Sequence, residues 1–145
     1  MKQILSLLLL TGLVACGSAD QKAPGAIDHS GATPKVDSAN LTTIQWIDSV
    51  DTDLGKVKEG QAVEVTYRFR NSGQKPLVIT DVKAGCGCTV PEKPEKPFAP
   101  GEEGTIRAKF DSKGRPKGEA RKMVYVSANT IPGNYDLSFK VDITE

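Results

Sequence analysis

The sequence predicts an all-β domain after residue 40, because apolar and polar side chains alternate along three segments. The alternation runs through Val63–Phe69, Ile106–Phe110 and Leu137–Ile143. A period of two places successive side chains on opposite faces of a strand, so each segment has one buried face and one face in water. Half-buried strands of this kind are typical of antiparallel sheets.

Further strands are expected where β-branched residues concentrate, at Thr42–Ile47, Leu77–Lys83 and Lys122–Ala128. No window of ten or more residues after Leu41 shows a helical stripe. About seven strands in roughly 100 residues predict two packed antiparallel sheets, an immunoglobulin-like sandwich, although a small barrel gives much the same pattern. The turn-forming residues between the strands are Asp53-Leu54-Gly55 with Gly60, Asn71–Gly73, Pro100-Gly101, Gly114–Gly118 and Pro132–Asn134.

The first 15 residues are interpreted as a lipoprotein signal peptide. Lys2 is followed by a mainly apolar stretch of 11 residues, Ile4–Val14, which is too short to span roughly 30 Å of hydrocarbon as a helix. The run Leu13-Val14-Ala15-Cys16 is similar to the bacterial lipobox, in which small residues precede a cysteine whose thiol accepts diacylglycerol. An ordinary secretory signal with an incidental cysteine is the alternative. We therefore expect a mature protein that begins at Cys16 and is held in a membrane by lipid on that residue.

Residues 16–40 are expected to form a disordered linker. The segment is rich in Gly, Ala, Ser, Pro and Asp and contains no aromatic residue, so it cannot bury enough apolar surface to offset the entropy of ordering. A chain of this length typically reaches roughly 25 to 30 Å. His29, the one histidine of the sequence, lies here and is interpreted as a solvated linker residue. The folded domain is predicted to occupy residues 41–145.

The charge of the mature chain argues against a nucleic-acid partner. Loss of Lys2 with the signal peptide reduces the 19 basic residues to 18, which equals the number of acidic residues. A neutral chain without a block of like charges lacks the electrostatic footprint that binding to phosphates requires.

Cys86 and Cys88 are the two thiols that remain after Cys16 is lipidated, and they lie in Ala84-Gly85-Cys86-Gly87-Cys88-Thr89 at the end of an expected strand. Residues two apart can place their Cα atoms about 5.5 to 6.8 Å apart if the backbone bends, so a redox-active disulfide is one interpretation. Coordination of Cu(I) by two thiolates is a second, whereas zinc would need more ligands than the chain offers. Small buried core side chains are the third.

The residues of the domain do not indicate an enzyme or a cofactor. The predicted domain has no histidine, and the common hydrolase, metalloprotease and nucleotide-binding motifs are absent from the sequence. The acidic residues Asp51, Asp53, Glu102 and Glu103 lie near Gly and Pro, and we interpret them as solvated turn residues.

The tryptophan and a group of basic residues are interpreted as parts of the sandwich rather than as a binding site. Trp46 is expected to pack in the core of the sandwich, and the alternative is an exposed platform for a sugar. The basic residues Arg68, Arg70, Arg107 and Lys109 are expected to lie on a solvated sheet face.

Several segments together form a recognisable pattern: Asp53–Gly55, Val65–Gly73, Pro76–Ile79, Cys86–Pro91, Pro100-Gly101 and Val126–Asn129. Through them, most of residues 41–145 resembles the family labelled domain of unknown function 1573. The resemblance implies an immunoglobulin-like fold related to the major sperm protein, and membership of a group with many bacterial lipoproteins. It implies no catalytic residue. The loop Gly114–Gly118 is longer than the turn usual in that family.

Together these observations predict a lipid-anchored binding or scaffolding module of the cell envelope, with another envelope protein as its partner. Thiol-redox or Cu(I)-handling chemistry at Cys86 and Cys88 is the alternative. Gly17 and Ser18 follow the lipidated cysteine in place of the aspartate associated with inner-membrane retention, so the outer membrane is favoured, on either its periplasmic or its surface side.

Overall fold

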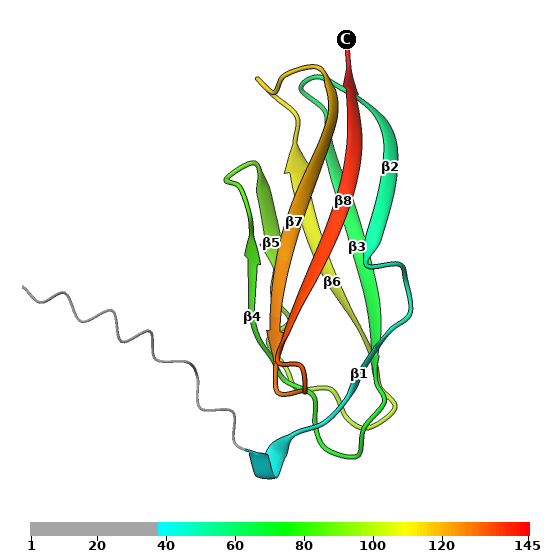
Figure 1. Ribbon diagram of the computed structural model, residues 1–145, viewed down its shortest axis with the longest axis vertical. Coiled ribbons are helices and arrows are strands. Elements are labelled where there is room, and N and C mark those ends of the chain that lie inside the picture. Colours follow the sequence, from blue (N-terminus) through cyan, green and yellow to red (C-terminus); the bar gives the residue numbers. More distant parts are fainter. Residues whose placement is uncertain (1–37) are drawn as a thin grey trace, which may run out of the picture. The chain divides into compact units, whose positions relative to one another are not determined.

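The computed structural model describes residues 38–145, which form a sandwich of two four-stranded sheets (Figure 1). The signal peptide, Cys16 and His29 lie outside the described residues, as does the expected linker apart from its last three residues, the 3₁₀ turn η1 (Ser38–Asn40). The strands are β1 (Ile44–Trp46), β2 (Asp51–Lys58), β3 (Ala62–Asn71), β4 (Ile79–Ala84), β5 (Thr89–Glu92), β6 (Glu103–Asp111), β7 (Gly118–Ala128) and β8 (Asn134–Thr144).

The predicted immunoglobulin-like sandwich is confirmed. One sheet has the order β1-β3-β6-β5 and the other the order β2-β8-β7-β4. Neighbouring strands are antiparallel except for β2 and β8, which run parallel with Asp51 opposite Ser138 and Val57 opposite Ile143. No helix among residues 38–145 is long and apolar enough to cross a membrane.

The prediction was wrong for the chain between β1 and β3 and for the segment after Cys88. The residues Asp53-Leu54-Gly55 are not a turn but the middle of β2, where the register against β8 shifts between Asp53 and Lys56. Gly55 adopts a φ of 69°, and the Asp53 carboxylate accepts a hydrogen bond from its N–H at 2.8 Å. The turn-like residues therefore build a β-bulge. With β5 also present, the sandwich has eight strands rather than about seven.

The core lies between the two sheets and is built from the inward side of each alternating strand. Its largest fully buried side chains include Tyr67 and Phe69 of β3, Phe110 of β6 and Phe139 of β8. Full burial of such a side chain contributes about 1.5 to 3 kcal/mol relative to exposure. Trp46 packs edge-on against Phe69, with ring centroids 5.9 Å apart, which confirms its predicted place against the core.

Asn71, at the end of β3, ties three chain segments together at one end of the sandwich. Its side chain is fully buried and its amide group donates to the backbone oxygens of Lys75 (2.8 Å) and Phe98 (2.9 Å). Its carbonyl oxygen accepts from the Thr42 hydroxyl at 2.9 Å and from the Gly73 N–H at 3.1 Å. One side chain thereby forms hydrogen bonds with three segments: the residues before β1, the β3–β4 loop and the β5–β6 loop.

Candidate functional site

Cys86 and Cys88 follow β4 directly and are joined by a disulfide. Their Cα atoms are 5.3 Å apart, so the backbone bends at this point rather than continuing the strand. The two sulfurs have different access to solvent, because Cys88 is 5% exposed while Cys86 is partly buried. Both cysteines pack against the core, and while the bond is intact neither offers a thiolate to a metal.

The disulfide-bonded turn connects the edge strands of the two sheets. On one side the Gly85 N–H donates to the Met123 oxygen of β7 at 2.9 Å, which continues the pairing of β4 by one residue. On the other side the Cys88 oxygen accepts from the Asp111 N–H at 3.0 Å, which begins the pairing of β5 with β6. The turn is thus a fixed corner between β4 and β5.

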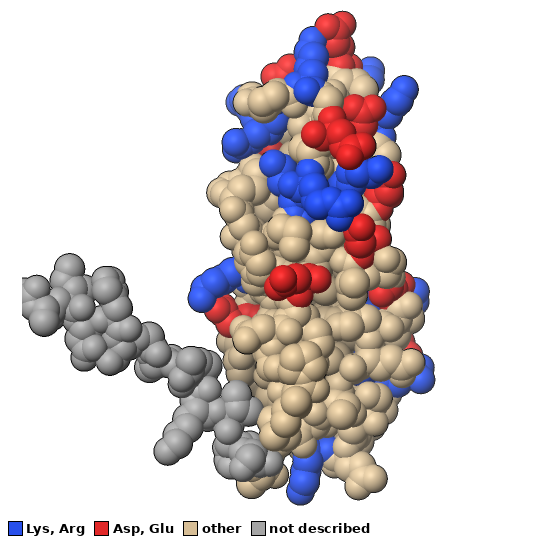
Figure 2. Space-filling model, in the orientation of Figure 1, with Lys and Arg blue, Asp and Glu red and all other residues tan. Residues whose placement is uncertain are grey.

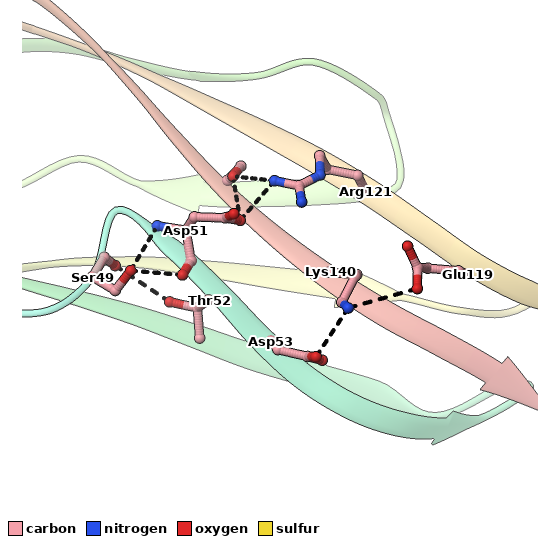
Figure 3. Close-up of polar contacts among 8 residues, drawn as sticks. Ser49, Asp51, Thr52, Asp53, Glu119, Arg121 and Lys140 are labelled. Carbon is pink, nitrogen blue, oxygen red and sulfur yellow. Dashed lines mark hydrogen bonds and ion pairs between the residues drawn. The ribbon is translucent and has the colours of Figure 1, made fainter.

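A cluster of polar side chains crosses the outer face of the second sheet, over β2, β8 and β7 (Figure 3). The Asp51 carboxylate accepts from the Ser138 hydroxyl at 2.6 Å and from the Arg121 guanidinium at 2.8 Å. Arg121 also donates to the Ser138 oxygen at 3.1 Å, so the three side chains form a closed set of hydrogen bonds. These contacts lower the pKa of Asp51, the Ser138 hydroxyl contributing most and Arg121 next, and they raise the pKa of Arg121.

The second half of the cluster is centred on Lys140, which lies two residues after Ser138 on β8 and therefore on the same face of the sheet. Its ammonium group is 3.1 Å from an Asp53 oxygen and 3.6 Å from a Glu119 oxygen, as the dashed lines in Figure 3 show. The Gly55 N–H is the largest cause of the lowered pKa of Asp53, followed by Lys140. The hydrogen bond to Asp53 raises the pKa of Lys140. Asp51 and Asp53 are therefore cross-strand partners, not the solvated turn residues that were expected.

The basic residues predicted on a sheet face lie on the outer face of the first sheet, each beside a carboxylate. The pairs are Arg68–Asp48, Arg70–Glu103, Arg107–Glu64 and Lys109–Glu92. Exposed ion pairs contribute little to stability, but because each of these four basic side chains has an acidic partner, they form no uncompensated basic patch on this face of the described domain.

Glu102, which was also expected to be a turn residue, lies in the turn before β6, where its carboxylate accepts a hydrogen bond from the Ala99 N–H at 2.8 Å.

Charged side chains are distributed unevenly over the face formed by β8 and β7. Figure 2 shows Lys, Arg, Asp and Glu gathered toward the end of β8, while the half nearer the β7–β8 turn is largely uncharged. Three exposed apolar side chains lie in this half: Ile131 (77% exposed), Tyr125 (44%) and Val78 (37%). Polar but uncharged residues, Asn129 and Asn134, accompany them. We call these five residues the neutral end.

Hydrogen bonds of Asn129 hold the neutral end together. Its side-chain oxygen accepts from the Val78 N–H at 2.7 Å, and its amide group donates to the Asn40 oxygen at 2.7 Å and to the Pro76 oxygen at 2.9 Å. The described chain therefore begins beside the neutral end. Neither this surface nor the polar cluster could be found from the sequence alone. Val78 and Asn129 of the neutral end are 51 residues apart, and Asp51 and Ser138 of the polar cluster are 87 apart.

The pockets and side-chain groups of residues 38–145 give no metal site. No group of three or more His, Cys, Asp or Glu side chains in this part of the chain is arranged to hold an ion. Two surface pockets are lined in part by residues of the ion pairs already described. One contains Glu92 and Arg107, and the other contains Asp53, Glu119 and Lys140.

The fold and its strand pairing define an immunoglobulin-like domain. The structure is similar to the PapD-like domain 7 of human CEP192, with a TM-score of 0.58 and 8% identity over 73% of this chain and 88% of that domain. It is also similar to the YadV chaperone, with a TM-score of 0.51 and 16% identity over 70% of this chain and 52% of that one. Identities this low establish the fold alone.

The chain belongs to the family described as "Protein of unknown function (DUF1573)", whose profile matches residues 45–143. A protein of unknown function from Porphyromonas gingivalis W83 has a TM-score of 0.64 and 17% identity over 76% of this chain. This chain spans half of that protein's length. A sequence comparison with curated proteins gives no match.

The lowered pKa of Asp51 leads to a pH-dependent prediction. Because the folded-state pKa lies below the unfolded value of about 3.9, the stabilisation from Asp51 is present above that value and is lost as the pH falls through the folded pKa. We expect the melting temperature of the wild-type protein to fall more steeply than that of Asp51→Asn below about pH 4. Melting curves between neutral and acidic pH test this, and parallel profiles for the two proteins would contradict it.

Proposed function

We infer that the chain is a lipid-anchored binding module of the bacterial cell envelope. In this proposal lipid on Cys16 holds the protein to a membrane, the outer membrane being favoured, and the sandwich binds another envelope protein without catalysing a reaction. The observation that carries the proposal is the neutral end, where exposed apolar side chains gather in the half of the face that has fewer charges.

The exposed side chains of the neutral end support a protein partner. Exposed apolar groups bordered by polar ones are typical of protein–protein contact sites, and tyrosine is enriched there because it combines a large apolar area with a hydroxyl. Ile131, in the turn after β7, has the highest exposed fraction of the large apolar residues in the described part of the chain. A PapD-like fold that also occurs in a chaperone, YadV, is compatible with such a role.

The place at which the described chain begins supports a partner near the membrane. Asn40 is hydrogen-bonded to Asn129, so the connection to residues 16–37 leaves from the neutral end. A flexible linker of about 25 residues typically reaches roughly 25 to 30 Å. With lipid on Cys16, the neutral end would lie within that distance of proteins embedded in or attached to the same membrane.

Replacing Ile131 by glutamate tests the proposed surface. The substitution puts a charge into the neutral end while leaving the core untouched, because the side chain is 77% exposed. In cells treated with a short cross-linker, we expect Ile131→Glu to reduce the adduct with the partner by about tenfold or more. Val90→Glu is the matched control, because Val90 is also an exposed apolar residue, at 63%, but lies on β5.

Equal adduct yields from Ile131→Glu and Val90→Glu would contradict binding at the neutral end. The anchor is tested separately with Cys16→Ser, which removes the thiol that accepts lipid. We expect this variant to be recovered without the mass of a diacylglycerol group. A Cys16→Ser protein that still carried the lipid mass would exclude Cys16 as the attachment site.

Thiol–disulfide exchange at Cys86 and Cys88 is a second candidate, favoured by the short loop that the bond closes. A disulfide between residues two apart gains little from restricting the unfolded chain, so a stabilising role explains it poorly. A substrate dithiol would pass two electrons and two protons to the bond, leaving Cys86 and Cys88 as thiols and the substrate as a disulfide. If alkylation of the native protein labels neither cysteine in the presence of a dithiol reductant, this candidate fails.

A further inference from the structure

The four edge strands of the sandwich differ in how their outward backbone groups are satisfied. An unpaired edge offers N–H and C=O groups to any chain that can lie beside it, so proteins normally block their edges. The edges here are β1 and β5 in the first sheet and β2 and β4 in the second. β1 has three residues and β5 four, which leaves β2 and β4 as the longer edges.

The β2 edge is blocked by nearby side chains. The Asp51 N–H donates to the Ser49 hydroxyl at 3.2 Å, and the Gly55 N–H donates to the Asp53 carboxylate at 2.8 Å. At the end of the strand the Lys58 N–H donates to the Gln61 side chain at 3.2 Å. The bulge at Gly55 bends the strand as well. An added strand would have to displace these local bonds.

The β5 edge is blocked by a proline. Cys88 accepts from Asp111 of β6, and backbone groups alternate in direction along an antiparallel strand. The backbone of Val90 therefore points toward β6 and that of Pro91 points away. Because proline has no N–H, the outward side of β5 lacks the donor that a neighbouring strand needs.

In the second half of β4, Asp81–Ala84, neither a proline nor a hydrogen bond from a nearby side chain blocks the open edge. Gly85 donates to Met123 of β7, and the register from Asp81 to Ala84 is regular. By the same alternation, Asp81 and Lys83 direct their backbone groups to β7, while Val82 and Ala84 direct theirs to the open side. No hydrogen bond joins β4 to any strand other than β7 among the described residues.

The charges of β4 are complementary to those of a second, antiparallel β4. Asp81 and Lys83 lie on the outer face, opposite Ser127 and Tyr125 of β7, and their charged atoms are 2.6 Å apart along the strand. If two copies pair about a twofold axis at Val82, the Asp81 of each copy lies opposite the Lys83 of the other. Opposite charges at such non-hydrogen-bonded positions stabilise an antiparallel pair.

We propose that two copies of this chain associate through their β4 edges. In this dimer the two Val82 residues exchange both backbone hydrogen bonds, Asp81 and Lys83 form two equivalent ion pairs, and the second sheets of the two copies join into one continuous sheet. A twofold axis makes the interface self-complementary, as is usual in homodimers. The interface adjoins the neutral end, because Tyr125 of β7 lies opposite Lys83 and Val78 directly precedes β4.

Charge-swap variants of the full-length, lipid-anchored chain in detergent test this pairing. Asp81→Lys and Lys83→Asp each place like charges opposite one another, and we expect each to weaken self-association by about tenfold. The double variant Asp81→Lys/Lys83→Asp restores opposite charges and should recover the wild-type dissociation constant. Mixing the two single variants should produce heterodimers in preference to either homodimer. Sedimentation equilibrium in density-matched detergent measures each case.

Val82→Pro provides a test that does not depend on charge. The substitution removes an N–H that points to the open side and that bonds to no strand of its own chain, so we expect the dimer to be lost. Because the Val82 side chain also packs against the core, the melting temperature should fall, and circular dichroism at the temperature of the sedimentation run checks that the domain is folded. A wild-type chain that sediments as a monomer, or a dimer that survives both single charge variants, would overturn the proposal. If a photo-reactive residue at position 82 instead cross-linked to a different protein, the β4 edge would be the binding site of that protein, and the proposed dimer would be wrong.

Discussion

Asn71→Asp is expected to destabilise the domain by about 4 kcal/mol at neutral pH. The change is isosteric, and the carboxylate still accepts from the hydroxyl of Thr42 and the N–H of Gly73. It no longer donates to the oxygens of Lys75 and Phe98, so a buried negative charge faces two carbonyl groups at 2.8 and 2.9 Å. Small domains are stable by only about 5 to 15 kcal/mol, so the loss is a large fraction of the total.

The pH dependence of this variant distinguishes charge from geometry. Burial next to carbonyl oxygens raises the folded-state pKa of the new carboxyl above its unfolded value of about 3.9. The carboxylate therefore destabilises the folded state above that value, and the deficit relative to the wild-type protein shrinks as the pH falls toward and below about 4. Urea unfolding at several pH values measures the difference.

Asn134→Asp is the matched control for Asn71→Asp. Asn134 is exposed, and its side-chain oxygen accepts from the Ser127 hydroxyl at 2.8 Å, which an aspartate can also do. We expect this variant to stay within about 0.5 kcal/mol of the wild-type protein. Equal stability losses at residues 71 and 134 would show that Asn71 does not organise the end of the sandwich.

Gly104→Ala is expected to destabilise the domain by about 3 kcal/mol. Gly104 is buried at the start of β6, opposite Phe69 of β3. An added Cβ would meet Phe69 and would lie only 2.5 and 2.7 Å from two ring carbons of Phe98. These two rings already pack edge to face, with centroids 5.0 Å apart, so the methyl group must push one of them out of its place.

Gly85→Ala controls for the loss of glycine itself. A Cβ at Gly85 would have its nearest neighbours, in Met123 and Tyr125, at 3.5 and 3.6 Å, which are ordinary contacts. Alanine also restricts the unfolded chain, so this variant should be neutral or stabilised by up to about 1 kcal/mol. Thermal or urea unfolding of the two variants gives the comparison, and a Gly104→Ala protein as stable as Gly85→Ala would contradict the packing described for β6.

Six of the eight strands could be predicted from the sequence, and the edge strands β2 and β5 could not. In β3, β6 and β8 the core imposes strict alternation, so the pattern is visible in the residues themselves. The short strand β5 contains Pro91, a residue that argues against a strand away from an edge. In β2 the residues Asp53-Leu54-Gly55 have the composition of a turn, and only pairing with β8 makes them a bulge.

Of the candidate functional residues, only those with a distinctive side-chain chemistry could be predicted from the sequence. Cys86 and Cys88 could be singled out because thiols are rare in the chain and chemically distinct. The contact of Asp51 with Arg121 depends instead on the parallel placement of β2 beside β8, and the two residues are 70 positions apart. The neutral end combines the residue before β4, the outer face of β7, the turn after it and the first residue of β8, so no local sequence pattern marks it.

A photo-reactive residue at position 131 of the full-length, lipid-anchored chain tests the proposed binding function most directly. The matched position is Lys113, which is exposed in the β6–β7 turn, away from the neutral end. After irradiation of intact cells, we expect a discrete adduct with one envelope protein from position 131 and none from position 113. An adduct of the same protein from position 113, together with none from position 131, would contradict binding through the neutral end.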